Sequence, residues 1–327
     1  MLKVGLIGCG FMGSMHANCY KNIEGAQVVA VADVRPEKAS ELAKLSDAKI
    51  YSTGFELIEK ADVDVIDICL PTYLHASHAL AAMDKVKYVF IEKPVTLTKE
   101  ESRQLLEKAA KTGAEVQVGQ VVRFFNEYAM LAEIIKDERY GKVLNANFRR
   151  LSPIPRWGFE NWLLDPVRSG GAGQDLHIHD IDYALSVFGK PNKIFSVKNA
   201  RDTENLYVNT LMQYDGFPVS AEGTWGLPES YSFTATFRVV FEKATVENAG
   251  GKLLCYKPEG VEEIPLDKLQ LSANYSGGNI SDLGGYFIEL LYFCEHAEKG
   301  LKIDKATLAE AVESLEFVLD ELAGASK

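Results

Sequence analysis

A glycine-rich turn near the N-terminus constrains the fold of this chain more than any other feature. Residues Gly8, Cys9, Gly10, Phe11, Met12 and Gly13 fit the pattern GxGxxG, between an apolar run (Val4–Ile7) and a helical pattern (Phe11–Lys21). Glycines there allow a tight turn, close approach of the backbone to a pyrophosphate, and close packing of helix on strand. The free N–H groups of the helix N-terminus favour phosphate. We therefore expect Gly8, Gly10, Phe11, Met12 and Gly13 to bind a dinucleotide; a glycine-rich turn without a ligand is the alternative.

An acidic residue ends the next predicted strand, Gln27–Ala32. Asp33 follows Gly13 by about 20 residues, the spacing at which a carboxylate accepts hydrogen bonds from the adenosine ribose. A 2′-phosphate would meet a like charge there, so NAD is expected rather than NADP. Arg35 could pair with that phosphate, which leaves NADP as the alternative and makes Arg35 a second predicted cofactor residue.

The first 120 or so residues alternate apolar strands with helices. Further strands are predicted at Val63–Cys69, Tyr88–Ile91 and Val116–Val118, and helices at Pro36–Leu45 and Thr98–Thr112. Continuous apolar strands separated by helices indicate a parallel sheet covered on both faces. The fold class expected is α/β, with a doubly wound Rossmann domain over residues 1–121.

The pattern changes in residues 122–327, which we expect to form a second domain that binds substrate and oligomerises. A helix at 173–188 is followed by long, mostly alternating strands, which predict an α+β domain with a large open, mostly antiparallel sheet. The uncovered face of such a sheet is naturally covered by a partner subunit, so a homodimer or homotetramer is expected. The predicted later elements are strands at Ile194–Ala200, Leu206–Tyr214, Val219–Trp225 and Tyr231–Phe241, and helices at Ile280–Glu298 and Ala306–Leu322.

Charge and composition exclude several classes of function. The net charge is −11, and lysines and arginines form no cluster, which excludes nucleic acid and argues against anionic membranes. The five cysteines form no CxxC pair, as is typical of reduced thiols. The chain starts directly with the first strand and contains no long apolar segment, so a cytoplasmic protein is expected.

Two further motifs follow predicted strands of the first domain. Leu70, Pro71, Thr72 and His75 follow one strand, and Glu92 and Lys93 follow the next. Ligands of a doubly wound sheet bind beyond the carboxyl ends of its strands, so these residues are expected to contact the cofactor.

The series of motifs resembles the glucose–fructose oxidoreductase/inositol dehydrogenase (Gfo/Idh/MocA) family along essentially the whole chain. The motifs are GxGxxG, His16-Ala17, Pro71–His75, Glu92-Lys93-Pro94, Trp162–Gly171 and Asp175–Asp182. The resemblance implies an active site of Lys93, Asp175 and His179, with Arg123 and Trp162 also at the substrate. It implies hydride transfer between nicotinamide and a secondary carbinol of a sugar, sugar acid or inositol. Ala172, His177 and Leu163 depart from the common pattern, which leaves the substrate open.

The chemistry of these residues agrees with that role. Asp175 and His179 are four residues apart on a predicted helix and share a face, so the carboxylate can orient the imidazole. Histidine can take the hydroxyl proton near neutral pH, and the Lys93 ammonium can stabilise the developing alkoxide. No metal is expected, because His177 and His179 point apart on a helix. A metal site formed by these histidines with Asp175 and Asp180 is one alternative. A purely structural role for His179 is another. A lyase or glycoside-processing enzyme that uses NAD, and a non-enzymatic NAD-binding regulator, are the alternative functions.

Overall fold

The computed structural model describes residues 1–199, 206–266 and 283–324, and the chain forms two compact units. Unit 1 combines Met1–Phe124 with Leu269–Val312, and unit 2 combines Phe125–Lys268 with Glu313–Lys327. The last helix, α10 (Leu308–Gly324), therefore starts in unit 1 and ends in unit 2. The functional division into residues 1–121 and 122–327 stays a prediction.

Unit 1 contains a six-stranded sheet in the order β3-β2-β1-β4-β5-β6. All neighbouring strands run parallel, which confirms the predicted doubly wound fold. The order reverses between β1 and β4, and the carboxyl ends of the strands there are the usual binding place for a dinucleotide. The strands are β1 (Leu2–Ile7), β2 (Ala26–Ala32), β3 (Lys49–Tyr51), β4 (Val65–Ile68), β5 (Tyr88–Ile91) and β6 (Glu115–Val118).

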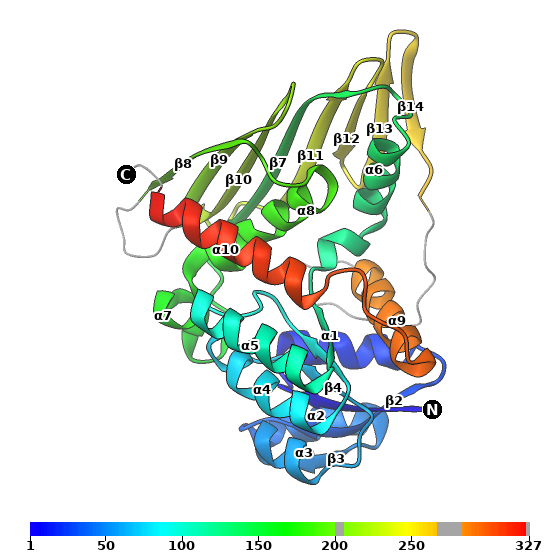
Figure 1. The fold of residues 1–327 in the computed structure, drawn as a ribbon, viewed down its shortest axis with the longest axis vertical. Helices are drawn as coiled ribbons and strands as arrows, with labels where there is room; N and C mark the ends of the chain where they lie inside the picture. The colour runs from blue at the N-terminus through cyan, green and yellow to red at the C-terminus, as the bar shows by residue number, and fades with distance from the viewer. Residues whose placement is uncertain (200–205, 267–282, 325–327) are drawn as a thin grey trace. The chain divides into compact units, whose positions relative to one another are not determined.

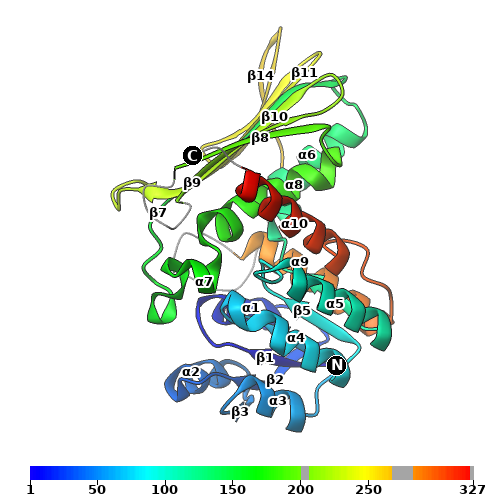
Figure 2. The ribbon, with the colours of Figure 1, turned by 60° about the vertical axis from the view of Figure 1, so that its left-hand side comes forward.

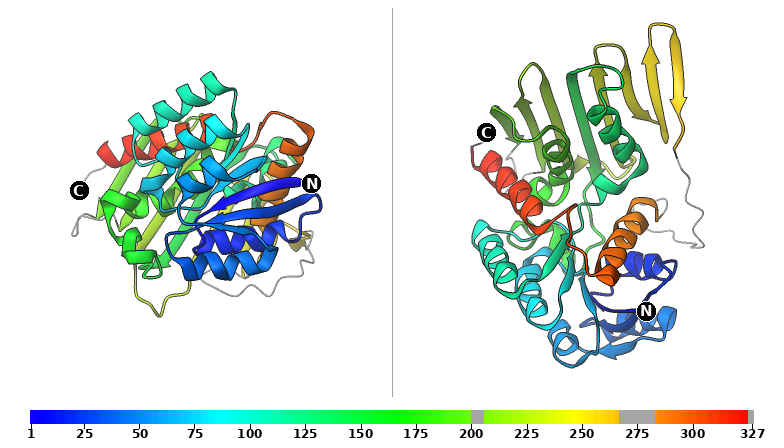
Figure 3. Two further views of the ribbon diagram at one scale, coloured as in Figure 1. Left: turned by 90° about the horizontal axis from the view of Figure 1, so that it is seen from below. Right: turned by 45° about the vertical axis from the view of Figure 1, so that its right-hand side comes forward.

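Helices cover both faces of this sheet, as seen from below in Figure 3. One face packs its apolar side chains against α1, α2 and α9 in a continuous core that includes Leu6, Met15 and Phe293. The helix α5 begins with a reciprocal cap, in which Thr98 and Glu101 each bond the other's backbone, and ends at Gly113 with φ of 73°. The helices are α1 (Phe11–Tyr20), α2 (Pro36–Ser46), α3 (Gly54–Lys60), α4 (His75–Lys85), α5 (Lys99–Thr112) and α9 (Gly284–Lys299).

Unit 2 contains an eight-stranded sheet, drawn in Figure 1 in the order β14-β13-β12-β11-β7-β10-β9-β8. Its neighbouring strands are antiparallel except for β10 and β7, which run parallel, so the predicted mostly antiparallel sheet is confirmed. Ala200 of the strand predicted at 194–200, and residues 280–282 of the later helix, lie outside the described residues. The strands are β7 (Val143–Pro153), β8 (Lys193–Asn199), β9 (Tyr207–Gln213), β10 (Pro218–Leu227), β11 (Thr234–Phe241), β12 (Thr245–Ala249), β13 (Lys252–Lys257) and β14 (Gly260–Ile264).

One face of the unit 2 sheet is covered by α6 (Asn126–Lys136), α8 (Ile178–Phe188) and the end of α10 (Figure 2). Tyr128 packs edge-on against both Tyr183 and Phe237 in the core between these layers. Trp225 and Phe241, which the sequence assigns to the sheet, are buried as well. The remaining short elements are η1 (Thr72–Leu74), η2 (Val121–Phe124), η3 (Phe159–Leu164), α7 (Pro166–Ser169) and the π-helical turn η4 (Gly173–His177).

Apolar side chains remain exposed near one edge of the other face of this sheet. Phe195 and Val197 on β8 are 60% and 41% exposed, and Leu211, which pairs with Phe195 across the strands, is 47% exposed. Among the described residues, no helix is both long and apolar enough to span a bilayer.

Candidate functional site

The glycine-rich turn has the geometry that a dinucleotide needs. Gly8 has a φ of +96°, and a Cβ on it would lie 2.4 Å from the carbonyl oxygen of Cys69. A Cβ on Gly13 would lie 1.8 Å from the carbonyl oxygen of Gly8, so both positions require glycine. At Gly10 the nearest atom to a Cβ is Arg35 Nη2, 3.6 Å away, and no side chain caps the start of α1. The first N–H groups of that helix therefore lack intrahelical acceptors and fit a pyrophosphate.

The predicted ribose-binding acid is held in place by its neighbours. Asp33 Oδ2 accepts a hydrogen bond from the Cys9 amide at 2.8 Å. The Arg35 guanidinium donates to both carboxylate oxygens of Asp33, each at 2.9 Å. Burial opposes ionisation of Asp33, but these hydrogen bonds outweigh it and lower the pKa of Asp33 below its ordinary value. Asp33 is therefore a carboxylate near neutral pH, and its charge is partly compensated by Arg35.

This pairing sharpens the prediction about coenzyme preference. Asp33→Ser removes the carboxylate and releases the Arg35 guanidinium that it holds, which makes the site more favourable for a 2′-phosphate. Since a hydrogen bond to a charged group contributes about 1.5–3 kcal/mol, the NADP-to-NAD ratio of binding constants should rise about ten- to a hundredfold. Titration with both coenzymes measures it. Asp33→Ser with Arg35→Gln is the matched control and should give a smaller rise. A wild type that prefers NADP would contradict this assignment.

The carboxyl ends of β4 and β5 are joined by a buried histidine. His75 is 1% exposed, and its ring nitrogens lie 2.7 Å from the Leu70 carbonyl oxygen and 2.8 Å from that of Pro94. Burial lowers the pKa of His75, although the two carbonyl oxygens favour its protonated form. His75 thus fixes the backbone on either side of the predicted cofactor residues. Direct contact of Leu70, Pro71, Thr72 and His75 with the cofactor stays a prediction.

Glu92 and Lys93 differ in their surroundings. Glu92 is 5% exposed, and one of its carboxylate oxygens accepts a hydrogen bond from the Lys93 amide at 3.2 Å. Lys93 is only half-buried at the end of β5. Their predicted contacts with cofactor and substrate stay predictions.

A buried polar network behind these strands was missed by reasoning from sequence. His16 Nδ1 lies 2.8 Å from Asp67 Oδ2, and its Nε2 lies 3.0 Å from Glu92 Oε1. The Tyr20 hydroxyl donates to Asp67 at 3.0 Å. Burial opposes protonation of His16, but Asp67 and Cys69 outweigh it and raise the pKa of His16 well above its ordinary value. The network ties the helix after the glycine-rich turn to the strands that end at the predicted cofactor residues.

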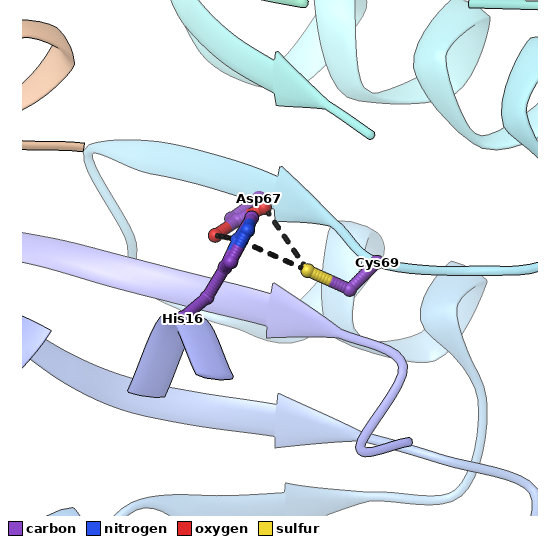
Figure 4. Close-up of side chains that lie close together, drawn as sticks. All are labelled: His16, Asp67 and Cys69. Carbon is purple, nitrogen blue, oxygen red and sulfur yellow. Dashed lines mark hydrogen bonds and ion pairs between the residues drawn. The ribbon is translucent and has the colours of Figure 1, made fainter. Parts of the chain in front are cut away.

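The sequence does contain a signal for this network. Asp67 lies inside the apolar strand β4, where a buried carboxylate must find donors. Figure 4 shows His16, Asp67 and Cys69 together, and they form a group whose potential ligand atoms lie within 4.8 Å of one another. Hydrogen bonds among the three side chains already account for this closeness: Cys69 Sγ is 3.2 Å from His16 Nδ1 and 3.4 Å from Asp67 Oδ1.

Asp175 and His179 lie on one continuous helix in unit 2. Asp175 is in the π-helical turn η4 and His179 is in the first turn of α8, and both side chains are half-buried. The two neighbours considered as metal ligands are engaged elsewhere. His177 Nε2 lies 3.1 Å from Glu321 Oε1, and Asp180 pairs with Arg150 at 2.9 Å. The structure therefore directs His177 and Asp180 toward structural partners.

Two further residues predicted at the substrate, besides the trio of Lys93, Asp175 and His179, have contacts within their own units. Arg123 is 7% exposed, and its Nη1 donates to Glu310 Oε1 at 2.8 Å. Trp162 is half-buried and packs against a small core of Leu163, Ala172, Leu176 and Trp225. Substrate contact by Arg123 and Trp162 stays a prediction.

Known proteins resemble this chain in sequence and in fold. Residues 2–120 match the family model "Oxidoreductase family, NAD-binding Rossmann fold" (GFO_IDH_MocA), and residues 128–247 match "GFO/IDH/MocA C-terminal domain". The chain is 33% identical to a myo-inositol 2-dehydrogenase of Thermotoga maritima over 193 residues, 58% of this chain and 55% of that enzyme. It is 28% identical to an inositol 2-dehydrogenase of Rubrobacter xylanophilus, over 75% of this chain and 71% of that enzyme. A levoglucosan dehydrogenase in complex with NADH and levoglucosan shares the fold with a TM-score of 0.84 and 20% identity, covering 99% of this chain and 97% of that one.

Proposed function

Because the chain belongs to the Gfo/Idh/MocA family of NAD-binding oxidoreductases, we propose that it transfers hydride between NAD and one secondary carbinol of a sugar, sugar acid or inositol. The observation that carries this proposal is the glycine-rich turn at the switch point of the sheet. Its Gly8 and Gly13 have no room for a side chain, and its helix N-terminus is uncapped. NAD, when bound, supplies the acceptor for the hydride.

We assign the proton chemistry to Lys93, Asp175 and His179. His179 accepts the proton of the substrate hydroxyl, and Asp175, four residues before it on the same helix, orients the imidazole. The Lys93 ammonium donates a hydrogen bond to the same oxygen and stabilises negative charge on it. These roles rest on the motif positions and on the exposure of each side chain within its own unit.

The names of the relatives support the substrate class. They include enzymes that act on inositols, on glucose 6-phosphate and on levoglucosan, which are all ring polyols. A lyase that uses NAD, or an NAD-binding regulator, remains the competing function. Both differ from a dehydrogenase in releasing no NADH when a simple polyol is added.

The experiment is a panel of inositols, aldoses and sugar acids mixed with enzyme and NAD, followed by absorbance of NADH. A dehydrogenase should release NADH with at least one member of the panel and should reduce the isolated product when NADH is supplied. NAD binding without turnover on the entire panel would favour the regulator. Turnover without net NADH would favour the lyase.

We also propose that the protein forms a homodimer or homotetramer through the unit 2 sheet. The face carrying Phe195, Val197 and Leu211 leaves large apolar side chains 41–60% exposed, and a second copy would shield them. Light scattering at micromolar concentration should give at least twice the mass of one chain, and Phe195→Lys should lower that mass. A wild type that remains monomeric would contradict the proposal.

A further inference from the structure

A buried imidazole–carboxylate pair lies beside the turn that carries Asp175. The side chains of His177 and Glu321 are both 0% exposed, and His177 Nε2 lies 3.1 Å from Glu321 Oε1. His177 is the last residue of the π-helical turn, two residues after Asp175 and two before His179. The pair therefore joins the helix with the proposed acid–base residues to the end of α10 (Figure 2), within unit 2.

Two hydroxyl groups from the sheet complete this cluster. The Thr210 hydroxyl on β9 donates to Glu321 Oε2 at 2.9 Å and lies 3.1 Å from His177 Nε2. The Ser196 hydroxyl on β8 lies 3.1 Å from Thr210 Oγ1 and 3.4 Å from Glu321 Oε2. Glu321 Oε2 thus receives hydroxyl donors from two strands, and Glu321 Oε1 lies against the imidazole of the helical turn. The cluster links these elements to one another.

Glycines make the room for this arrangement. A Cβ on Gly223 of β10 would lie 2.9 Å from His177 Nδ1, and one on Gly173 would lie 2.7 Å from Leu322 Cδ1. The imidazole therefore lies directly against the backbone of the sheet, and the start of the turn lies directly against α10. The turn has little freedom to shift without breaking the cluster.

A π-helical turn needs such support. Its hydrogen bonds reach one residue further than those of an α-helix, so it occurs as a single turn, often at functional sites. A buried imidazole or carboxylate that loses its hydrogen-bond partner is costly, so the cluster holds the turn in one place. A small displacement of a catalytic group is enough to reduce turnover strongly.

We infer that His177 and Glu321 are positioning residues, which set Asp175 and His179 through the π-helical turn. This inference rests on the proposed roles of Asp175 and His179. In this proposal the end of α10 holds the π-helical turn in place, and Glu321 itself contacts no reacting group.

The test compares three variants of the full-length protein. Glu321→Ala removes the acceptor and should lower kcat about tenfold or more, with the Kd for NAD changed less than about twofold. Glu321→Gln keeps a polar side chain of the same size beside His177 and Thr210, so it should restore most of the turnover. Tyr183→Phe is the matched control on α8, because it deletes another buried hydrogen bond, from Tyr183 to the Tyr128 carbonyl at 2.6 Å. It should lower the melting temperature but leave kcat unchanged.

A second readout does not depend on turnover. With ring-labelled histidine, the NMR signal of the His179 ring, assigned with His179→Gln, should shift in Glu321→Ala and stay in place in Tyr183→Phe. If Glu321→Ala does not fold, Thr210→Val takes its place in the test. It removes one hydroxyl while keeping the carboxylate, and it should produce smaller changes of kcat and of the His179 signal in the same direction.

Normal kcat together with an unshifted His179 signal in folded Glu321→Ala, or in Thr210→Val where Glu321→Ala does not fold, would overturn the inference. So would equal loss of kcat in Glu321→Ala and Tyr183→Phe. If the wild type turns over no polyol at all, the proposed function fails, whereas the His179 signal still decides whether the pair positions the turn.

Discussion

His179→Ala should lower turnover about 10²–10⁴-fold, the usual loss when a general base is removed. The glycine-rich turn and Asp33 lie in unit 1 and His179 lies in unit 2, so the Kd for NAD should change little. Steady-state kinetics on the substrate found in the panel, with a separate NAD titration by fluorescence, measures both quantities. His296→Ala, a half-buried histidine of α9, is the matched control and should keep its turnover.

The other members of the trio extend this prediction. Lys93→Ala should also abolish most turnover, because it removes the charge that stabilises the alkoxide, and Asp175→Asn should be milder than His179→Ala. The double variant Lys93→Ala/His179→Ala should lose less than the product of the two single losses, since both groups act on one proton transfer. Near-normal turnover in folded His179→Ala that still binds NAD would remove His179 as the base.

Asp180→Ala should destabilise unit 2 by about 3–5 kcal/mol, the usual effect of removing one partner of a buried ion pair. Asp180 is 0% exposed, and Arg150 donates to its two carboxylate oxygens at 3.0 Å and 2.9 Å. The variant takes the compensating carboxylate away from Arg150, a residue that is itself only 4% exposed. Such a loss is a large fraction of the 5–15 kcal/mol by which domains are ordinarily stable.

Urea unfolding followed by tryptophan fluorescence measures this effect. Trp157, Trp162 and Trp225 are the three tryptophans of the chain, and all lie in unit 2, so the signal reports on that unit. Arg150→Met with Asp180→Leu replaces both charges by apolar groups and should recover most of the stability. An unfolding midpoint in Asp180→Ala equal to that of the wild type would show that the pair contributes nothing.

The first domain could be predicted closely because its signals are local. The apolar strands, the glycines at Gly8 and Gly13, and the cap from Thr98 to Glu101 each depend on residues a few positions apart. The sequence missed β3, α3 and α4, which are short or lack a clean period. In unit 2 it indicated the strands from β8 to β11 but neither β12 to β14 nor the parallel pairing of β7 with β10, because register between distant strands depends on packing.

The residues of the proposed site were named from sequence, and the partners that hold them were not. Arg35, which the structure pairs with Asp33, was named from the sequence only as a possible partner for a 2′-phosphate, although the two residues are neighbours in the chain. His75 was expected at the cofactor, yet its ring is engaged by two backbone carbonyls, a contact that depends on how β4 and β5 end side by side.

The sequence by itself determined the parallel sheet, the dinucleotide turn and the family, since backbone sterics and hydrophobic period act over short stretches. Only the tertiary structure decided which buried ionisable side chains meet. His16 pairs with Asp67 across 51 residues and Arg150 with Asp180 across 30, and His177 meets Glu321 of the helix α10. The physical reason is that a buried charge requires a partner but does not specify where in the chain the partner lies; the packing of helices on sheets makes that choice.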